Sequence, residues 1–190
     1  SQSSQKKDSR REFILKTGTF GAGALIASNQ IGVSLATGAE SPPNSAKALV
    51  GSQLYGWGQY YQRMGKNWSE HMDEIFSALR DGGYDYAEGF VDVNRPENMV
   101  HFADRLRSKG LAPVSLYTGG RLHENGKSDE VVEKLIQAGS VCRQAGFRII
   151  NCNPDPIGRE KSDEELKVQA RALTKLAEGL KQHKVQLGIH

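Results

Sequence analysis

The sequence has few of the residues that mark disulfide-stabilised, redox or clustered-metal proteins. Its 190 residues include only two cysteines, Cys142 and Cys152, and their spacing is not that of a CxxC metal or redox site. Neither cysteine lies in a loop-rich segment that would need a covalent link. We therefore expect two buried free thiols, with a disulfide between them as the alternative.

Charge of one sign and long apolar runs are also scarce. The net charge is only +3, and basic residues close to the N-terminus account for the excess. The rest of the chain lacks the basic stripe of a nucleic-acid-binding protein, so no nucleic-acid partner is expected. The most apolar stretch, residues 17–35, is rich in glycine and is interrupted by Ser28-Asn29-Gln30, which argues against a stable membrane span.

The N-terminal segment is typical of an export signal. Arg10 and Arg11 precede Glu12-Phe13-Ile14-Leu15-Lys16, and this run resembles the twin-arginine motif. We predict a signal peptide over residues 1–39 and a linker over 40–48, with a disordered basic tail as the alternative to the signal. The resemblance implies the twin-arginine export machinery as a partner and a periplasmic or exported location.

From residue 49 onward, a strand followed by a helix recurs along the chain. Apolar runs predict strands, helix-period segments separate them, and glycines such as Gly82-Gly83, Gly110 and Gly146 end the helices. The spacing is that of one βα unit with its crossover helix, which predicts parallel pairing. The strands are expected at residues 49–55, 84–90, 111–117, 147–152 and 185–190.

This repeat predicts an α/β fold, a (β/α)8 TIM barrel of which residues 49–190 hold about the first four and a half units. A complete barrel typically needs about 250 residues, so the segment is expected to be its N-terminal half. An open, doubly wound sheet is the alternative. It is disfavoured because no strand leads into the Gly-x-Gly-x-x-Gly loop that holds a dinucleotide.

Local signals also predict where the helices begin and which residues face inward. Asn67 with Glu70 and Ser162 with Glu165 have the spacing of a capping box, and Ser128 is the expected cap of the third helix. Val100 and Leu166 are placed on the buried stripes of their helices. The segment Gly56 to Tyr61 is expected to be a loop after the first strand.

Strand ends converge in a parallel barrel, so the residues that follow the strands are the candidates for chemistry. Glu88 ends the second strand among aromatic residues, where a partly desolvated carboxylate suits general acid or base catalysis. A structural carboxylate is the alternative. His190, at the end of the fifth strand, suits metal ligation or proton transfer, with an ordinary hydrogen-bonding histidine as the alternative.

Further strand-end residues are candidates for substrate binding. Trp57 and Tyr60 could form an apolar platform for a sugar ring, or a lid over the barrel core. Asn153 and Asp155, next to Pro154 and Pro156, could hold substrate hydroxyls, with a rigid turn as the alternative role. The predicted substrate-binding set is Trp57, Gln59, Tyr60, Tyr117, Asn153 and Asp155.

Three segments carry a resemblance to a known family: Gly83-Tyr84-Asp85-Tyr86-Ala87-Glu88, Asn151-Cys152-Asn153 and Leu187-Gly188-Ile189-His190. With them the chain resembles the N-terminal half of the sugar phosphate isomerase/epimerase family, the xylose isomerase-like TIM barrels. The resemblance implies isomerisation or epimerisation of a sugar or keto-sugar by proton transfer beside a carbonyl. It also implies a divalent metal ion, such as manganese, magnesium, cobalt or zinc.

In that family the metal is held by carboxylates and a histidine from strands five to eight, and His190 stands where the first ligand is commonly a glutamate. This departure leaves open a lyase or hydrolase of oxidised sugars on the same barrel. A non-catalytic carbohydrate-binding barrel is a further alternative. A nuclease of the endonuclease IV kind fits poorly, because strand-end histidines are absent before His190.

Overall fold

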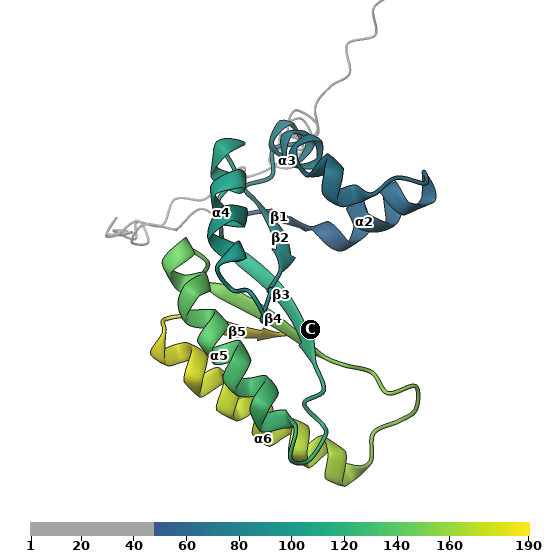
Figure 1. Ribbon diagram of the computed structural model, residues 1–190, viewed down its shortest axis with the longest axis vertical. Helices are drawn as coiled ribbons and strands as arrows, with labels where there is room; N and C mark the ends of the chain where they lie inside the picture. The colour runs from purple at the N-terminus through teal and green to yellow at the C-terminus, as the bar shows by residue number, and fades with distance from the viewer. Residues whose placement is uncertain (1–47) are drawn as a thin grey trace, which may run out of the picture. The chain divides into compact units, whose positions relative to one another are not determined.

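Five parallel strands alternate with helices along residues 48–190, the part of the chain that the computed structural model describes (Figure 1). The predicted signal peptide, 1–39, and the predicted linker up to residue 47 lie outside the described residues. The strands are β1 (Gly51–Gln53), β2 (Tyr86–Phe90), β3 (Ser115–Gly120), β4 (Ile149–Pro154) and β5 (Gln186–Ile189). The helices are α2 (Leu54–Arg63), the 3-10 helix η1 (Trp68–His71), α3 (Met72–Asp81), α4 (Asn98–Ser108), α5 (Ser128–Ala145) and α6 (Asp163–Gln182).

The strands pair in the order in which they occur in the sequence, from β1 to β5, and every pair is parallel. A doubly wound sheet contains a switch point at which this order reverses, and the five described strands contain none. Each strand therefore lies beside the next one along the chain, as in a barrel. The predicted α/β fold, part of a (β/α)8 barrel, is confirmed.

The core lies between the sheet and the helices along one of its faces (Figure 1). Side chains of a strand alternate between two faces, and Ala87, Leu116 and Ile150 point from neighbouring strands into this layer. Phe76 and Leu135 meet them from α3 and α5 and are fully buried. The other face of the sheet is thereby free to carry polar groups.

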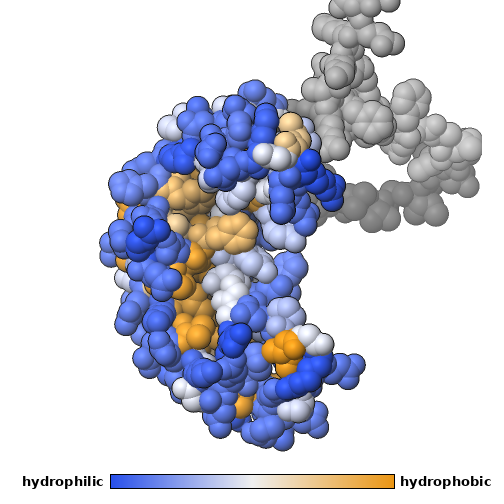
Figure 2. Space-filling view, turned by 45° about the vertical axis from the view of Figure 1, so that its right-hand side comes forward, coloured by the Kyte–Doolittle hydropathy of each residue, from blue (hydrophilic) through white to orange (hydrophobic). Residues whose placement is uncertain are grey.

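β1 and β5 form the two edges of the sheet, and apolar side chains are uncovered beside them. Val50 precedes β1 and Ile189 ends β5, and both are exposed. A band of hydrophobic side chains runs down the face that Figure 2 shows, between hydrophilic margins. Within the described residues, no helix combines the length and the apolar character needed to cross a membrane.

The structure corrects the prediction for the segment after β1. The expected strand 49–55 is reduced to Gly51–Gln53, and the expected loop is helix α2, which begins at Leu54. Glycine disfavours helix, and α2 contains Gly56 and Gly58. Leu54 and Tyr61, two helical turns apart, are nevertheless both buried, so tertiary packing of one helix face outweighs the local preference.

The predicted inward stripes are wrong at two positions. Val100 and Leu166 are exposed, whereas Met99 and Val168 are buried in their place. In α4 the inward face is the set Met99, Ala103 and Leu106, so it begins one residue before the expected position. Spacing alone could not distinguish these two registers, because apolar residues occupy both.

The capping predictions have mixed outcomes. The capping box of Ser162 and Glu165 is confirmed at the start of α6, with each side chain bonded to the other residue's backbone N–H. Ser128 is not a cap but the first residue of α5, and Lys127 precedes it without a side-chain capping bond.

The two cysteines are buried free thiols, as predicted. Burial raises the pKa of Cys142 to about 12 and, together with the charge of Asp155, the pKa of Cys152 to about 11. The thiolate is the reactive form of cysteine, and it is scarce at neutral pH when the pKa is so high. Both side chains therefore act as core residues.

We expect the acid sensitivity of the fold to depend on Glu165. Two hydrogen bonds from the Arg159 guanidinium, and a third from the Ser162 N–H, hold its pKa at about 2, compared with an ordinary value of 4.5. The stabilising effect is thus complete above about pH 4.5 and is lost as the pH falls towards 2. Glu165→Gln should lower the free energy of unfolding at pH 7 and flatten its decline below pH 4.5, measured by urea denaturation.

Glu178→Gln is the matched control, because Glu178 is exposed on the same helix. It should leave the pH profile of stability unchanged. Identical pH profiles of stability for Glu165→Gln and the unmodified protein would contradict the stabilising role of the Glu165 carboxylate.

Candidate functional site

A cavity of about 420 Å3 opens where the carboxyl ends of the strands meet. Parallel strands present these ends at one edge of the sheet, so side chains far apart in the sequence gather there. Each of the five strand ends contributes to the lining, and α2 closes one side. The lining residues are Gln53, Tyr55, Glu88, Phe90, Tyr117, Asn153 and His190.

Glu88 lies at the base of this cavity with only 6% of its surface exposed. Its Oε1 accepts hydrogen bonds from the Ser115 hydroxyl and the Asn151 amide, both at 2.5 Å. Its Oε2 accepts a bond of 2.6 Å from the Gln53 amide. Residues of β1, β3 and β4 therefore all converge on one carboxylate of β2.

Strand register explains why these residues meet. Gln53 pairs directly with Glu88, and Gly89 pairs with Leu116, which brings Ser115 level with Glu88. Side chains one position away point to the opposite face and enter the core. The alternation therefore separates a polar face at the cavity from an apolar face under the helices.

Gly188 of β5 makes room for one of these donors. It pairs with Asn151 in the sheet, and a Cβ at Gly188 would overlap the side-chain oxygen of Asn151. Only a glycine therefore allows the Asn151 side chain to lie across β5. Its amide nitrogen can then reach both Glu88 and the Ser115 hydroxyl, the latter at 3.1 Å.

The hydrogen bonds leave Glu88 with one open acceptor position. A carboxylate offers about four such positions, and three are used by the protein. Bonds to a charged acceptor are strong, and they compensate for the water that the buried group has lost. The remaining position on Oε2 suits a hydroxyl of a bound ligand, because Glu88 borders the cavity.

The carboxylate also acts on a neighbour. Burial raises the pKa of Tyr86, and the negative charge of Glu88 raises it further. Tyr86 lies two residues before Glu88 and so on the same face of β2. Its hydroxyl thus stays protonated beneath the site.

Aromatic and imidazole rings form the mouth of the cavity. The Tyr117 ring meets Phe90 edge to face at 5.9 Å between centroids, and His190 in the same manner at 6.0 Å. The backbone N–H of His190 donates to the Cys152 carbonyl at 3.1 Å and so extends the β4–β5 pairing. His190 is exposed, which leaves its imidazole accessible to a ligand.

Four of the eight predicted site residues therefore come together in this cavity: Glu88, Tyr117, Asn153 and His190. The other four lie elsewhere. Asp155 binds backbone, since its Oδ1 accepts from the Gly120 N–H at 2.9 Å and its own N–H donates to the Gly120 carbonyl. Trp57 and Tyr60 line a separate hollow with Gln53, and Gln59 lines a second cavity beside α2.

Sequence reasoning missed several members of the site. Gln53 and Ser115 bind Glu88, and Tyr55 and Phe90 line the cavity. Polar residues at alternating positions of otherwise apolar strands were the available signal for Ser115. Tyr55 could not be found in this way, because it was assigned to a strand and belongs to α2.

The family resemblance implies a divalent metal ion. Among the described residues, no three His, Cys, Asp or Glu side chains are arranged to hold one. His190 is the one imidazole at the cavity, and Glu88 is occupied by protein donors on both oxygens.

Comparison with solved structures identifies proteins that have a similar fold. No protein-family model and no curated protein sequence matches the chain. A sugar phosphate isomerase/epimerase from Parabacteroides distasonis ATCC 8503 matches with a TM-score of 0.60 and 17% identity, over 77% of this chain and 53% of that one. An L-ribulose 3-epimerase matches with a TM-score of 0.51 and 22% identity, over 75% and 49%.

A third match is the IOLI protein with a bound zinc atom, with a TM-score of 0.48 and 19% identity over 62% of this chain and 45% of that one. The chain thus spans about half the length of the solved structures that it matches. At these identities the likeness establishes the fold. The chain has the partial TIM-barrel fold of structures that include sugar isomerases and epimerases.

We expect Gly188→Ala to disturb the Glu88 network. The added Cβ would displace the Asn151 side chain, and overpacking of this kind costs about 1 to 3 kcal/mol. Urea denaturation should report this loss. Gly56→Ala in α2 is the control, because nothing lies within 4 Å of its added Cβ, and it should be neutral or stabilise by up to about 1 kcal/mol. Equal stability of Gly188→Ala and the unmodified protein would show that Asn151 is not confined by β5.

Proposed function

We propose that the protein is a member of the sugar phosphate isomerase/epimerase family that isomerises or epimerises a sugar or keto-sugar. The observation that carries the proposal is the buried Glu88 carboxylate, held by three donors at the base of a strand-end cavity. A cavity of about 420 Å3 lies in the size range of small-molecule sites. Its polar base and aromatic mouth match a sugar, which has hydroxyl groups and an apolar C–H face.

In the proposed reaction, Glu88 orients the substrate and His190 moves the proton. The open acceptor position on Glu88 binds a substrate hydroxyl, and the Asn153 side chain lines the same cavity. The His190 imidazole takes the proton from the carbon beside the carbonyl, and the electron pair left behind forms an enediolate. Return of this proton to the neighbouring carbon, with transfer of the hydroxyl proton to the other oxygen, gives the isomer. Delivery of a proton from solvent to the opposite face of the original carbon gives the epimer.

Export and metal use belong to the proposal as well. The Arg10-Arg11 motif supports passage through the twin-arginine machinery to the periplasm. A divalent ion is the cofactor that the resemblance implies, and His190 is the described residue best placed to contribute a ligand to it.

A non-catalytic carbohydrate-binding barrel is the second candidate. The observation in its favour is that protein donors occupy most of the Glu88 carboxylate. A carboxylate held in this way can anchor a hydroxyl without any chemical step. The two candidates differ in whether a substrate proton exchanges with solvent.

We expect the full-length protein to exchange the proton beside the carbonyl of at least one sugar or keto-sugar in D2O. Glu88→Gln and His190→Ala should each reduce this exchange about 100-fold or more, the contribution typical of a positioned acid or base. NMR of the sugar signals measures the rate. His101→Ala is the control, because His101 is exposed on α4, away from the lining of the cavity.

The assay is run with and without manganese, magnesium, cobalt and zinc. Absence of exchange with every sugar under all these conditions would reject the isomerase proposal. Sugar binding that persists in Glu88→Gln without any exchange would favour the binding barrel.

A further inference from the structure

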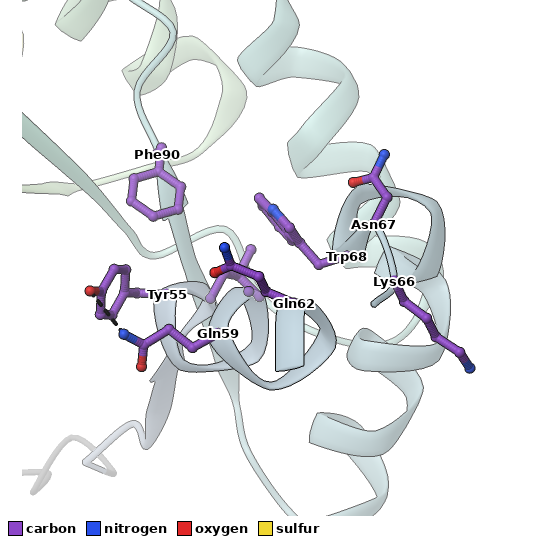
Figure 3. Close-up of a pocket in the computed structure, with 9 residues that line it drawn as sticks. Tyr55, Gln59, Gln62, Lys66, Asn67, Trp68 and Phe90 are labelled. Atoms are coloured by element: carbon purple, nitrogen blue, oxygen red, sulfur yellow. Dashed lines mark hydrogen bonds between the residues drawn. The ribbon is translucent and has the colours of Figure 1, made fainter. Parts of the chain in front are cut away.

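A second cavity, of about 440 Å3, adjoins the Glu88 cavity. The two share Tyr55 and Phe90 as lining residues, so they lie next to each other. The second cavity lies between α2, the start of η1 and the end of β2 (Figure 3). It is therefore on the same side of the sheet as the proposed reaction site.

Aromatic rings dominate the walls of the second cavity. Tyr55 and Phe90 are 61% and 42% exposed, which is high for aromatic side chains in a folded domain. Trp68 packs against the core with part of its ring and lies over Gly58, with indole atoms 3.8 Å from the position of a Cβ there. Figure 3 shows the Trp68 ring directed towards the space between Phe90 and Gln62.

Neutral amides supply the polar groups of the same cavity. Gln59 donates to the Tyr55 hydroxyl at 3.0 Å, which holds that ring in place (Figure 3). The Gln62 side chain has no hydrogen-bond partner within the described part of the chain, so both its donor and its acceptor are available to a ligand. Lys66, the one charged lining residue, extends away from the aromatic rings in Figure 3.

Aromatic faces beside uncharged amides are suited to an uncharged carbohydrate ring. The rings pack against the C–H face of a sugar, and an amide exchanges hydrogen bonds with neighbouring hydroxyls. A phosphate or carboxylate would require a cation directed into the cavity, and Lys66 is directed away from the rings. A second sugar ring thus suits this space better than an anionic group.

Resting on the proposed function, we infer that the substrate is a neutral disaccharide whose reacting ring has a free carbonyl in its open-chain form. Its reacting ring occupies the Glu88 cavity, and its distal ring lies in the second cavity against Trp68 and Phe90. Tyr55 and Phe90 flank the linkage between the two rings, since they line both cavities. Gln62 hydrogen-bonds the distal ring and so distinguishes a disaccharide from a single sugar.

Calorimetric titration of the full-length protein with single sugars and disaccharides tests this inference. The probes are glucose and methyl glucoside on one side, and the reducing disaccharides cellobiose, maltose and lactose on the other. At least one disaccharide should bind ten times more tightly than glucose. A panel in which no disaccharide binds more tightly than glucose would overturn the inference.

Single-residue variants test whether the second cavity causes the difference in affinity between disaccharides and glucose. Gln62→Ala should weaken binding of the preferred disaccharide about three- to tenfold, the value of one hydrogen bond, and leave glucose binding unchanged. Gln62 is exposed, so its loss does not disturb the core, and Gln137→Ala on the exposed side of α5 is the matched control. An equal loss for glucose and the disaccharide in Gln62→Ala would also overturn the inference.

Trp68→Ala should weaken disaccharide binding tenfold or more, provided that its unfolding transition matches that of the unmodified protein. Because Trp68 also packs on the core, Gln62→Ala decides the question if Trp68→Ala does not fold. The two proposals fail separately. Proton exchange without a preference for disaccharides would overturn only the inference about the second cavity. A preference for disaccharides that depends on Gln62, without any proton exchange, would overturn only the isomerase proposal.

Discussion

Burying the carboxylate of Glu88 where the strands end costs several kcal/mol unless hydrogen bonds replace the lost water. Gln53, Ser115 and Asn151 supply these bonds, and each comes from a different strand. The carboxylate is satisfied only when these strands keep their register, because a slip of one residue turns a donor to the opposite face. The same interaction therefore holds the sheet in register and shapes the base of the cavity.

The constraint extends to residues that do not touch the carboxylate. Gly188 must lack a side chain so that Asn151 can lie across β5. Helix α2 begins one residue after Gln53, so Tyr55 stands between the Glu88 cavity and the second cavity. A site carried on paired strands and a helix is positioned more precisely than one carried on loops. Rigid elements thus determine the dimensions of both cavities.

Much of this arrangement was predictable from the chain. The recurring strand and helix patterns indicated a parallel α/β sheet, and convergence of parallel strand ends predicted that Glu88, Tyr117, Asn153 and His190 would meet. The prediction was wrong for α2, where buried Leu54 and Tyr61 outweigh two glycines. Trp57 and Tyr60 lie on this helix and line a different hollow.

The sequence by itself determined the order of the elements, the alternation of polar and apolar residues along the strands and the capping box of α6. These features depend on near neighbours in the chain, whose geometry is the same in any fold. Only the tertiary structure decided that the Glu88 carboxylate would accept hydrogen bonds from Gln53, Ser115 and Asn151. It also decided that Asp155 would bind the backbone of Gly120. Such contacts join residues about 30 to 60 positions apart, and they exist only once strand register brings distant groups within hydrogen-bonding distance.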